Sequence, residues 1–379
     1  MSPAVSIVKC QSYDEKKVLE TLRQSIHLMG GLECFIKKGD RVLLKPNLLI
    51  GKSPDKVVTT HPSIIKAAIQ IAQEAGGIPF IGDSPAIGST ARAAEKAEIA
   101  EIARSMDCPI VEFNRPVLAR EVKGRVFKNI EIDQAVLEAD VIINLPKWKT
   151  HTQMLLTLGV KNLFGCVSGP KKALWHLKAG EDRKLFAQVL VDVYQIVRPA
   201  LTILDGVNGM EGDGPTSGRS IALGLILASC DALSLDQIVC DLLGIPRRSL
   251  MTNRVALEHG LGKDPIEVVG EKVENVKIPD FQFPNLSRTD WNLPGFIKKA
   301  LKNALTSKPA IQEDLCKNCH QCAEICPPRA LTPEGESLVF DYRRCIRCFC
   351  CLEVCPEGAV SIKQGWAIGV IDKAMGKRH

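Results

Sequence analysis

Two periodicities of hydrophobic residues alternate along roughly the first 270 positions of the chain. Short runs rich in β-branched residues, bounded by glycine, proline or polar residues, predict strands. We place these strands at Val5–Val8, Arg41–Lys45, Ile78–Gly82, Val141–Leu145, Leu201–Asp205, Ala222–Ala228 and Ile266–Val269.

Between these strands, hydrophobic residues recur every three or four positions, which predicts helices. We place the helices at Glu15–Leu28, Ser63–Ala75, Thr90–Met106, Leu185–Val197 and Asp231–Leu243. Pro62 stands where a first helical turn tolerates proline, and Gly76 and Gly77 follow a helix where a left-handed residue is needed. The alternation of strands and helices predicts an α/β fold: a mostly parallel sheet with flanking helices.

The pattern changes twice toward the C-terminal end. We expect a large α/β domain over residues 1–278, a proline-punctuated connector over 279–308, a small α+β domain over 309–363 and a tail over 364–379. The connector carries Lys298, Lys299 and Lys302, which we interpret as a solvated face. The tail contains Trp366 and Ile368, and we expect it to pack back on the body.

Composition narrows the classes of function. A net charge of +6, with 5% aromatic residues and no basic stripe, argues against nucleic-acid binding. The longest apolar run, Ile221–Cys230, is too short to span a bilayer, so we expect no transmembrane segment. The N-terminus lacks the features of a secretory signal, and we expect a cytoplasmic protein.

Eight of the fifteen cysteines fall in two clusters that share one spacing, C-x2-C-x2-C-x3-C-P, and the second cluster starts 29 residues after the first. This repeat resembles the two-cluster bacterial ferredoxin family over about residues 310–363. The resemblance implies two [4Fe-4S] clusters, each held by three cysteines of one repeat and the fourth of the other. Cluster 1 would be bound by Cys316, Cys319, Cys322 and Cys355, and cluster 2 by Cys345, Cys348, Cys351 and Cys326.

Zinc is the alternative metal, because thiolates bind it as well. Structural zinc sites take four ligands in two C-x2-C pairs, which the duplicated triplets do not match. Cys350 is a spare cysteine that would either pack or compete as a ligand. Between Cys316 and Pro356 five basic residues balance five acidic ones, which favours an internal electron wire over a diffusing carrier.

Polar residues of the large domain gather just after the predicted strands, where open α/β sheets bind ligands. The ends of parallel strands meet at one edge, so we expect these residues to converge on one crevice that attracts a carboxylate or phosphate. The predicted substrate-binding residues are Lys45, Asn47, His61, Asp83, Ser84, Lys147, Lys161 and Asn162. The predicted catalytic residues are Lys149, His151, Asp205 and Glu211. Each residue alone also has a structural explanation as a helix cap, a turn or a buried histidine.

No nucleotide-binding fingerprint is present, because the chain lacks both G-x-x-x-x-G-K-[ST] and a G-x-G-x-x-G run that opens a helix. The motifs instead resemble, as a set, family 362 of the domains of unknown function, over most of residues 1–270. They are Val42–Asn47, His61-Pro62, Gly82–Pro85, Lys149–His151, Gly159–Gly165, and Asp205-Gly206 with Met210–Pro215. The resemblance implies fusion to a ferredoxin module but supplies no reaction.

Three hypotheses remain open. The chain is an iron-sulfur oxidoreductase of anaerobic type that passes single electrons to or from an anionic substrate or a redox partner protein, because tethering raises the effective concentration of the module. Alternatively, it is a non-enzymatic electron carrier or redox subunit that docks onto another enzyme. In the third hypothesis the large domain is a redox-independent enzyme, and the clusters sense redox state or brace the fold.

Overall fold

The computed structural model describes residues 4–119, 125–169, 171–284, 307–334 and 337–363. Most of the predicted connector, including its three lysines, and the whole predicted tail lie outside these ranges. Among the described residues, no helix combines the length and hydropathy that crossing a bilayer requires.

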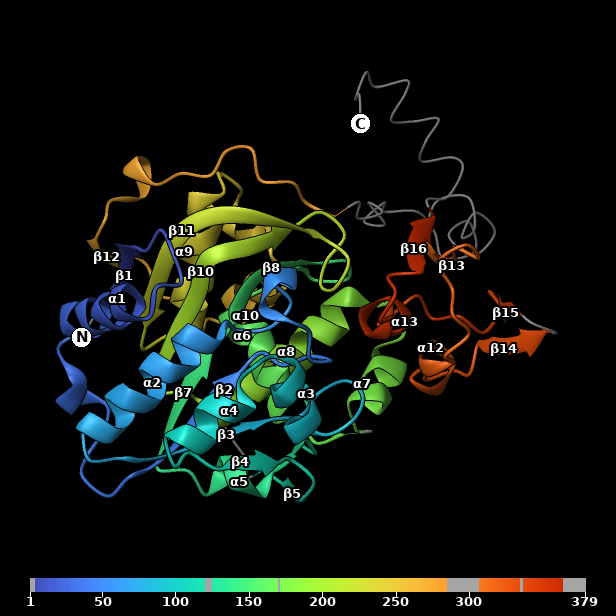
Figure 1. The fold of residues 1–379 in the computed structure, drawn as a ribbon. Helices are drawn as coiled ribbons and strands as arrows, with labels where there is room; N and C mark the ends of the chain where they lie inside the picture. The colour runs from blue at the N-terminus through green and yellow to red at the C-terminus, as the bar shows by residue number, and fades with distance from the viewer. Residues whose placement is uncertain (1–3, 120–124, 170, 285–306, 335–336, 364–379) are drawn as a thin grey trace.

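A ten-stranded mixed sheet forms the centre of the large domain (Figure 1). Its main path runs in the order β12-β1-β11-β10-β7-β2-β3-β4, and β8 and β9 extend it beside β10. Most neighbouring strands are parallel, and the antiparallel pairs are β1–β11, β10–β11 and β8–β9. The strands are β1 (Ala4–Lys9), β2 (Arg41–Pro46), β3 (Ile78–Asp83), β4 (Ile110–Glu112), β7 (Val141–Leu145), β8 (Lys147–His151), β9 (Leu155–Thr157), β10 (Leu201–Glu211), β11 (Arg219–Ser229) and β12 (Glu267–Gly270). A separate small pair joins β5 (Pro116–Leu118) to β6 (Glu131–Asp133).

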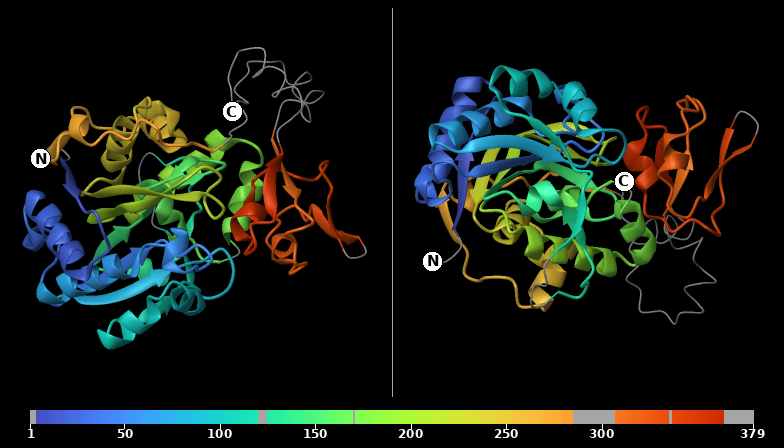
Figure 2. Two further views of the ribbon diagram at one scale, coloured as in Figure 1. Left: turned by 45° about the horizontal axis from the view of Figure 1, so that its top comes forward. Right: turned by 90° about the horizontal axis from the view of Figure 1, so that it is seen from below.

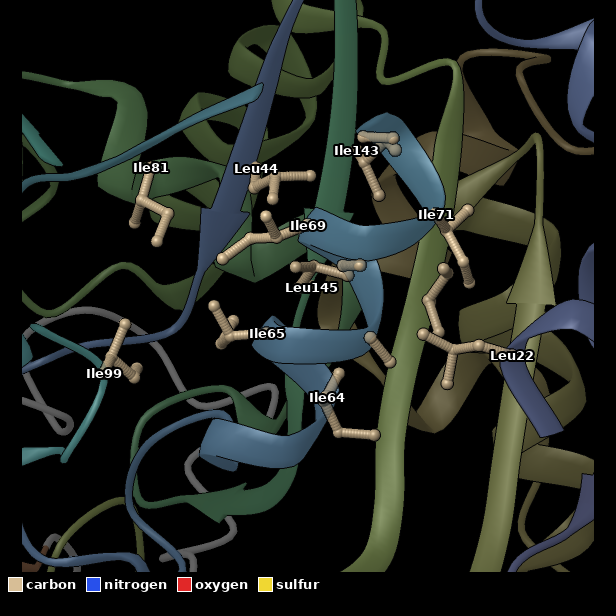
Figure 3. Close-up of a cluster of buried hydrophobic side chains, with 14 of the residues drawn as sticks. Leu22, Leu44, Ile64, Ile65, Ile69, Ile71, Ile81, Ile99, Ile143 and Leu145 are labelled. Carbon is tan, nitrogen blue, oxygen red and sulfur yellow. The ribbon is translucent and has the colours of Figure 1, made fainter. Parts of the chain in front are cut away.

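Helices cover both faces of this sheet (Figure 2). Successive side chains of a strand point to opposite faces. Leu44 therefore belongs to the core that includes residues of α1 and α2, and Leu43 belongs to the core on the other side, which includes residues of α8. Figure 3 shows the first of these cores, where isoleucines of α2 meet the strands. The helices of the large domain are α1 (Glu15–Leu28), α2 (Pro62–Glu74), α3 (Thr90–Lys96), α4 (Ala100–Ser105), α5 (Gln134–Leu137), α6 (Gly159–Asn162), α7 (Lys171–Ala179), α8 (Arg183–Val197), α9 (Ala232–Leu242) and α10 (Met251–Glu258).

The predicted helix Thr90–Met106 is wrong as a single element, because the chain forms α3 and α4 with a break between them. Glu98 adopts a left-handed conformation, with φ of 58°, which a continuous helix does not allow. The break places Ile99 at 0% exposure in the core. The remaining predicted helices match α1, α2, α8 and α9 within two residues at each end.

Two stretches after the predicted strands are also strands rather than turns. The glycine-rich segment that follows Asp205 continues β10 as far as Glu211, in a long hairpin with β11. Gly206 and Gly209 are needed there, because a Cβ atom would lie 2.8 Å from the carbonyl of Leu225 or 2.5 Å from the side chain of Leu223. The polar segment Lys147–His151 forms β8, which the sequence analysis did not predict.

The C-terminal module consists of two copies of one short unit. Its elements are β13 (Lys308–Ile311), α12 (Gln321–Glu324), β14 (Leu331–Glu334), β15 (Ser337–Phe340), α13 (Cys350–Val354) and β16 (Val360–Lys363). The first cysteine loop, Cys316–Cys322, and the second, Cys345–Cys351, share their backbone geometry. Asn318 and His320 have φ of 50° and 58°, and the equivalent Arg347 and Phe349 have 51° and 59°.

The module docks on the large domain through α13, as Figures 1 and 2 show. Ile50, Ala86 and Ile87 of the large domain pack against the hydrophobic core of the module. Hydrogen bonds between described residues cross the contact: Lys52 Nζ donates to the carbonyl of Pro356 at 2.6 Å, and Thr216 Oγ1 donates to that of Leu352 at 3.1 Å.

Candidate functional site

A buried ion pair lies where β2 and β3 end side by side. Lys45 Nζ is 2.8 Å from Asp83 Oδ1, and Asp83 Oδ2 accepts a hydrogen bond from the backbone N–H of Leu48. Gly165 passes so close that a Cβ atom there would lie 2.0 Å from Asp83 Oδ1 and 2.7 Å from Lys45 Nζ. The glycine that ends the Gly159–Gly165 motif is therefore required by this ion pair.

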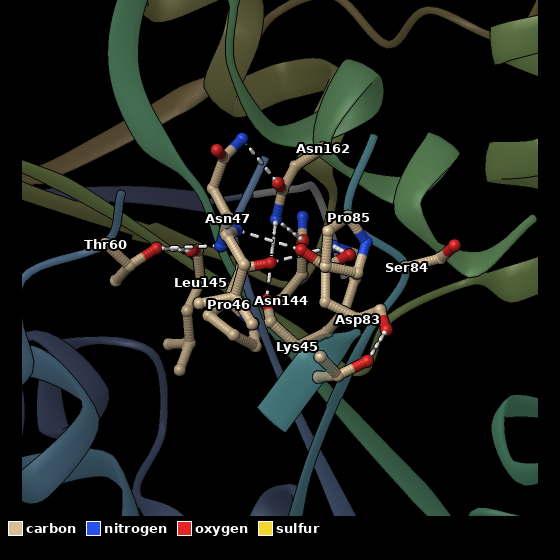
Figure 4. A network of polar contacts seen from close by, with 12 residues as sticks. Lys45, Pro46, Asn47, Thr60, Asp83, Ser84, Pro85, Asn144, Leu145 and Asn162 are labelled. Carbon is tan, nitrogen blue, oxygen red and sulfur yellow. Dashed lines mark hydrogen bonds and ion pairs between the residues drawn. The ribbon is translucent and has the colours of Figure 1, made fainter. Parts of the chain in front are cut away.

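A chain of amide side chains adjoins the ion pair (Figure 4). Asn47 Nδ2 donates to Asn162 Oδ1 at 2.9 Å, and Asn162 Nδ2 donates to Asn144 Oδ1 at 2.8 Å. Lys149 Nζ donates to Asn47 Oδ1 at 2.9 Å and to the carbonyl of Val58 at 2.6 Å. Burial lowers the pKa of Lys149 to about 7, and the charge of Lys161 adds to this effect.

His151 of β8 faces Glu353 of the module. His151 Nδ1 accepts hydrogen bonds from the backbone N–H groups of Gln153 and Met154, so the neutral ring carries its proton on Nε2. That nitrogen lies 2.8 Å from Glu353 Oε1, off the line of an ideal hydrogen bond. Burial lowers the pKa of His151 to about 4, which keeps the ring neutral at pH 7. Burial opposes ionisation of Glu353, but His151 and Lys161 lower its pKa overall.

Helix α7 adds two further side chains. Lys172 Nζ donates to the carbonyls of Ser84 and Pro85, and burial lowers its pKa to about 8. His176 stacks on Phe186 with ring centroids 4.2 Å apart, and burial lowers its pKa to about 3. Its Nδ1 atom is buried and has no hydrogen-bond partner in the described part of the chain.

These side chains surround a cavity between the large domain and the module, which we call the interdomain cavity. Its volume is about 790 Å³ including space open to solvent. Eight predicted site residues line it: Lys45, Asn47, Asp83, Ser84, Lys149, His151, Lys161 and Asn162. The sequence analysis missed Lys172 and His176 of α7 and Glu353 of the module. The module also contributes Ile325, Cys350 and Val354 to the lining.

Three other predicted site residues lie together elsewhere, with Tyr13, in what we call the inner cluster: Tyr13, His61, Lys147 and Asp205. Lys147 Nζ is 2.9 Å from Asp205 Oδ2 and 2.6 Å from the hydroxyl of Tyr13, which donates to Asp205 Oδ1 at 2.7 Å. His61 stacks on Tyr13 with ring centroids 3.5 Å apart. The expected single crevice is therefore wrong for these residues, because Lys147 and Asp205 are register partners in the β8–β10 pair and satisfy each other.

Glu211 lies in a third place, at the end of β10. Its Oε1 atom is 2.7 Å from Arg219 Nε across the hairpin, and its Oε2 atom accepts a hydrogen bond from the backbone N–H of Gln282. Glu211 does not line the interdomain cavity.

The cysteines of the first predicted quartet surround a cavity of their own. Cys316, Cys319, Cys322 and Cys355 line a space of about 350 Å³. In the second quartet, burial and the neighbouring Cys348 and Cys326 raise the pKa of Cys345, so a cysteine of the first repeat lies beside the second loop. Within the described residues, no three acidic, histidine or cysteine side chains are close enough to hold one metal ion. Sulfurs spread around a cavity fit a cubane better than a single zinc ion.

The two cysteine loops differ in exposure. Cys319 of the first loop is exposed, whereas Cys345 and Cys348 of the second loop are only 8% and 7% exposed. Cys350 follows in α13, buried, and is the one cysteine of the module that lines the interdomain cavity within the described residues.

Comparisons with known proteins match both the large domain and the C-terminal module. Residues 42–241 match the family described as "Domain of unknown function (DUF362)", and residues 302–359 match "4Fe-4S dicluster domain". The chain is 39% identical over 315 residues to thylakoid-associated protein sll1697 of Synechocystis sp., an alignment that covers 80% of this chain and 95% of that protein.

Solved structures are more distant. The lactate racemase apoprotein from Thermoanaerobacterium thermosaccharolyticum gives a TM-score of 0.39 at 13% identity, covering 60% of this chain and 54% of that chain. A Thermotoga maritima protein gives 0.35 at 13% identity, covering 54% of this chain and 52% of that chain. The chain thus spans about half the length of each, and likenesses this weak carry no argument about function. The two family matches identify both parts of the chain. The chain belongs to the DUF362 family and carries at its C-terminal end a 4Fe-4S dicluster domain, which holds two [4Fe-4S] clusters.

Proposed function

We propose that this protein is an oxidoreductase that relays single electrons between two [4Fe-4S] clusters and a small anionic substrate in the interdomain cavity. The observation that carries the proposal is the position of Cys350. It lines the interdomain cavity and stands between Cys348 and Cys351 in the sequence. A substrate in the cavity would therefore lie within a few residues of a cluster.

We assign the ligands by repeat. Cys316, Cys319, Cys322 and Cys355 would hold cluster 1, and Cys345, Cys348, Cys351 and Cys326 would hold cluster 2. The cavity that the first four cysteines line supports the first assignment. The second loop has the same backbone geometry as the first, which supports the second assignment. When bound, such clusters supply one-electron oxidation and reduction.

The large domain supplies binding and proton chemistry. Lys149, Lys161 and Lys172 bring positive charge to the cavity, which favours an anion. Lys149, whose pKa burial lowers to about 7, is our candidate proton donor for a substrate that gains an electron. The neutral ring of His151 keeps its Nε2–H beside Glu353 and can offer it to a substrate as a hydrogen-bond donor. Apolar walls, including Phe164 and Val354, limit the access of water and strengthen these interactions.

The test follows the reoxidation of the clusters. Anaerobically reconstituted protein is reduced with dithionite, freed of excess reductant and mixed with small anionic oxidants while the visible absorbance is recorded. We expect one of them to reoxidise the wild type at least tenfold faster than the His151→Ala variant, at equal iron content. Lys16→Ala, at an exposed position of α1, is the control and should react like the wild type. Equal rates for the wild type and His151→Ala would contradict a role for the cavity.

A second candidate function is that of a redox subunit without a substrate of its own. Two observations favour it: Cys319 is exposed, so an outside protein can approach the first loop, and a relative bears the name thylakoid-associated protein. Co-purification with a redox enzyme, with reoxidation only in its presence, would support this function. Reoxidation of the isolated protein by a small anion would exclude it as the sole role.

A further inference from the structure

We propose that the interdomain cavity selects a small dianion, a dicarboxylate or a phosphate, over a monoanion of the same size. This inference rests on the proposed function, because it names the substrate class of the same site. The argument uses the charges that line the cavity, the hydrogen-bonding capacity that they leave unused and the walls that limit the size of the ligand.

The charged lining is unbalanced. Among the described residues, four lysines line the cavity, Lys45, Lys149, Lys161 and Lys172, together with two carboxylates, Asp83 and Glu353. His151 and His176 add donor or acceptor atoms but no charge at pH 7, because burial lowers their pKa values to about 4 and about 3. Counted with every lysine protonated, the described lining carries two more positive than negative charges. Burial lowers the pKa values of Lys149, Lys161 and Lys172, and a bound dianion would favour their protonated forms. Buried charges are costly unless paired, so the surplus indicates a ligand with two negative charges.

The two carboxylates are already engaged. Asp83 lies 2.8 Å from Lys45 and also accepts the N–H of Leu48, which leaves it no role toward a ligand. Glu353 lies 2.8 Å from His151 and feels the charge of Lys161. The positive surplus is therefore carried by the lysines that Asp83 does not pair: Lys149, Lys161 and Lys172.

These three lysines also keep donors in reserve. An ammonium group has three N–H donors. Lys149 uses two of them, on Asn47 and Val58, and Lys172 uses two, on Ser84 and Pro85. Lys161 makes no hydrogen bond or ion pair with any described residue. Burial lowers its pKa, and the attraction of Glu353 opposes this effect only in part. The buried Nδ1 of His176 is unpartnered as well within the described chain.

The remaining walls are apolar and set the size. Leu49 and Phe164 of the large domain and Ile325 and Val354 of the module line the cavity. They leave room for a short carbon skeleton or a small phosphate ester, and they exclude water from the ion pairs. A dicarboxylate and a phosphate share one property that this site would recognise, which is two negative charges placed close to Lys161.

The test compares matched anions on the reconstituted protein by calorimetry at constant ionic strength. The probes are succinate and butyrate, which have equal carbon number but different charge, and inorganic phosphate. We expect succinate or phosphate to bind at least tenfold tighter than butyrate. A preference for succinate identifies a dicarboxylate, and a preference for phosphate identifies a phosphate. Equal affinity for all three anions, or binding of none, would overturn the proposal.

Variants connect the selectivity to the cavity. Lys161→Met should lose the dianion preference, Lys161→Arg should keep it, and Lys16→Met on exposed α1 should leave it unchanged. If Lys161→Met fails to fold, loss of the preference in Lys172→Met decides the matter. Dianion binding without any reoxidation of the clusters would leave the site standing and remove the oxidoreductase. Reoxidation by a monoanion or a neutral compound, with no dianion binding, would support the oxidoreductase and contradict the dianion site.

Discussion

The inner cluster and the interdomain cavity contain the same kinds of residue but treat charge differently. In the inner cluster, Lys147 and Asp205 form one ion pair at 2.9 Å, closed by the Tyr13 hydroxyl. In the interdomain cavity, four lysines meet two carboxylates. The sequence analysis placed the predicted residues of both regions just after strands, so that placement alone does not distinguish a structural network from a binding site. What distinguishes the binding site is its surplus of positive charge and of unused hydrogen-bond donors.

The largest expected effect follows from removing a lysine in each region. Lys147→Met leaves Asp205 as an unpaired buried charge and should destabilise the protein by about 3–5 kcal/mol. Lys161→Met removes a cation that has no ion-pair partner among the described residues and should preserve or raise stability. Urea unfolding followed by circular dichroism measures both. A large loss in Lys161→Met, or none in Lys147→Met, would reverse the assignment of the two regions.

A smaller effect is expected at the backbone that supports the cavity. Gly165→Ala would place a Cβ atom 2.0 Å from Asp83 Oδ1, which forces Asp83 and Lys45 apart. Such overpacking typically costs about 1–3 kcal/mol. We also expect succinate binding to weaken, because the cavity wall shifts. Lys16→Ala, at an exposed position of α1, is the control and should change neither stability nor binding. Thermal unfolding and calorimetry of both variants decide the outcome, and equal behaviour would contradict the packing argument.

Hydrogen bonds provide the next comparison. Tyr13→Phe removes the hydroxyl that donates to Asp205 and accepts from Lys147, so it should cost about 1–3 kcal/mol. His176→Phe keeps the ring that stacks on Phe186 and removes a nitrogen without a partner in the described chain. It should cost little or nothing. Urea unfolding midpoints of the two variants measure this difference. An equal loss of stability in both variants would refute it.

The smallest effect expected is a pH dependence confined to the cavity. Burial lowers the pKa of Lys149 to about 7 and that of Lys172 to about 8, so both lose charge as pH rises through this range. Succinate affinity should therefore be highest below pH 7 and fall as the pH increases. Their effect on stability has the opposite sign: the unfolded state keeps these protons up to about pH 10.4, so stability should rise with pH from 7 upward. Calorimetry and unfolding over about pH 6.5–9 test both signs.

The sequence predicts elements well where the hydrophobic pattern is strong. Helix α1 runs from Glu15 to Leu28 as predicted, because its apolar stripe starts after the capping side chain of Asp14. Strand β8 could not be predicted, because four of its five residues are polar although all are buried. Periodicity reports burial only when the buried side chains are apolar.

The site was predictable only in part. The sequence identified eight lining residues of the large domain, but it missed Lys172 and His176 of α7, the separation of the inner cluster and the contribution of the module. Strand-end positions identified Lys45, Asp83 and Lys149, but they did not show that Lys147 pairs with Asp205 in register. Glu353 stands at one of the x positions of the C-x2-C-x2-C-x3-C-P motif, where the motif does not specify the residue. Nothing local in the sequence signals that α13 faces another domain, since docking depends on contacts such as Lys52 with Pro356 that join distant segments.

The most direct test of the central claim is a redox titration of the reconstituted protein with and without saturating succinate. An anion bound beside a cluster opposes the arrival of an electron, so succinate should lower the midpoint potential of at least one cluster. By linkage, a tenfold weaker binding to the reduced protein corresponds to about 59 mV for one electron. We predict this shift in the wild type and in Lys16→Met but not in Lys161→Met. Identical potentials in the wild type with succinate bound and absent would contradict communication between the cavity and the clusters.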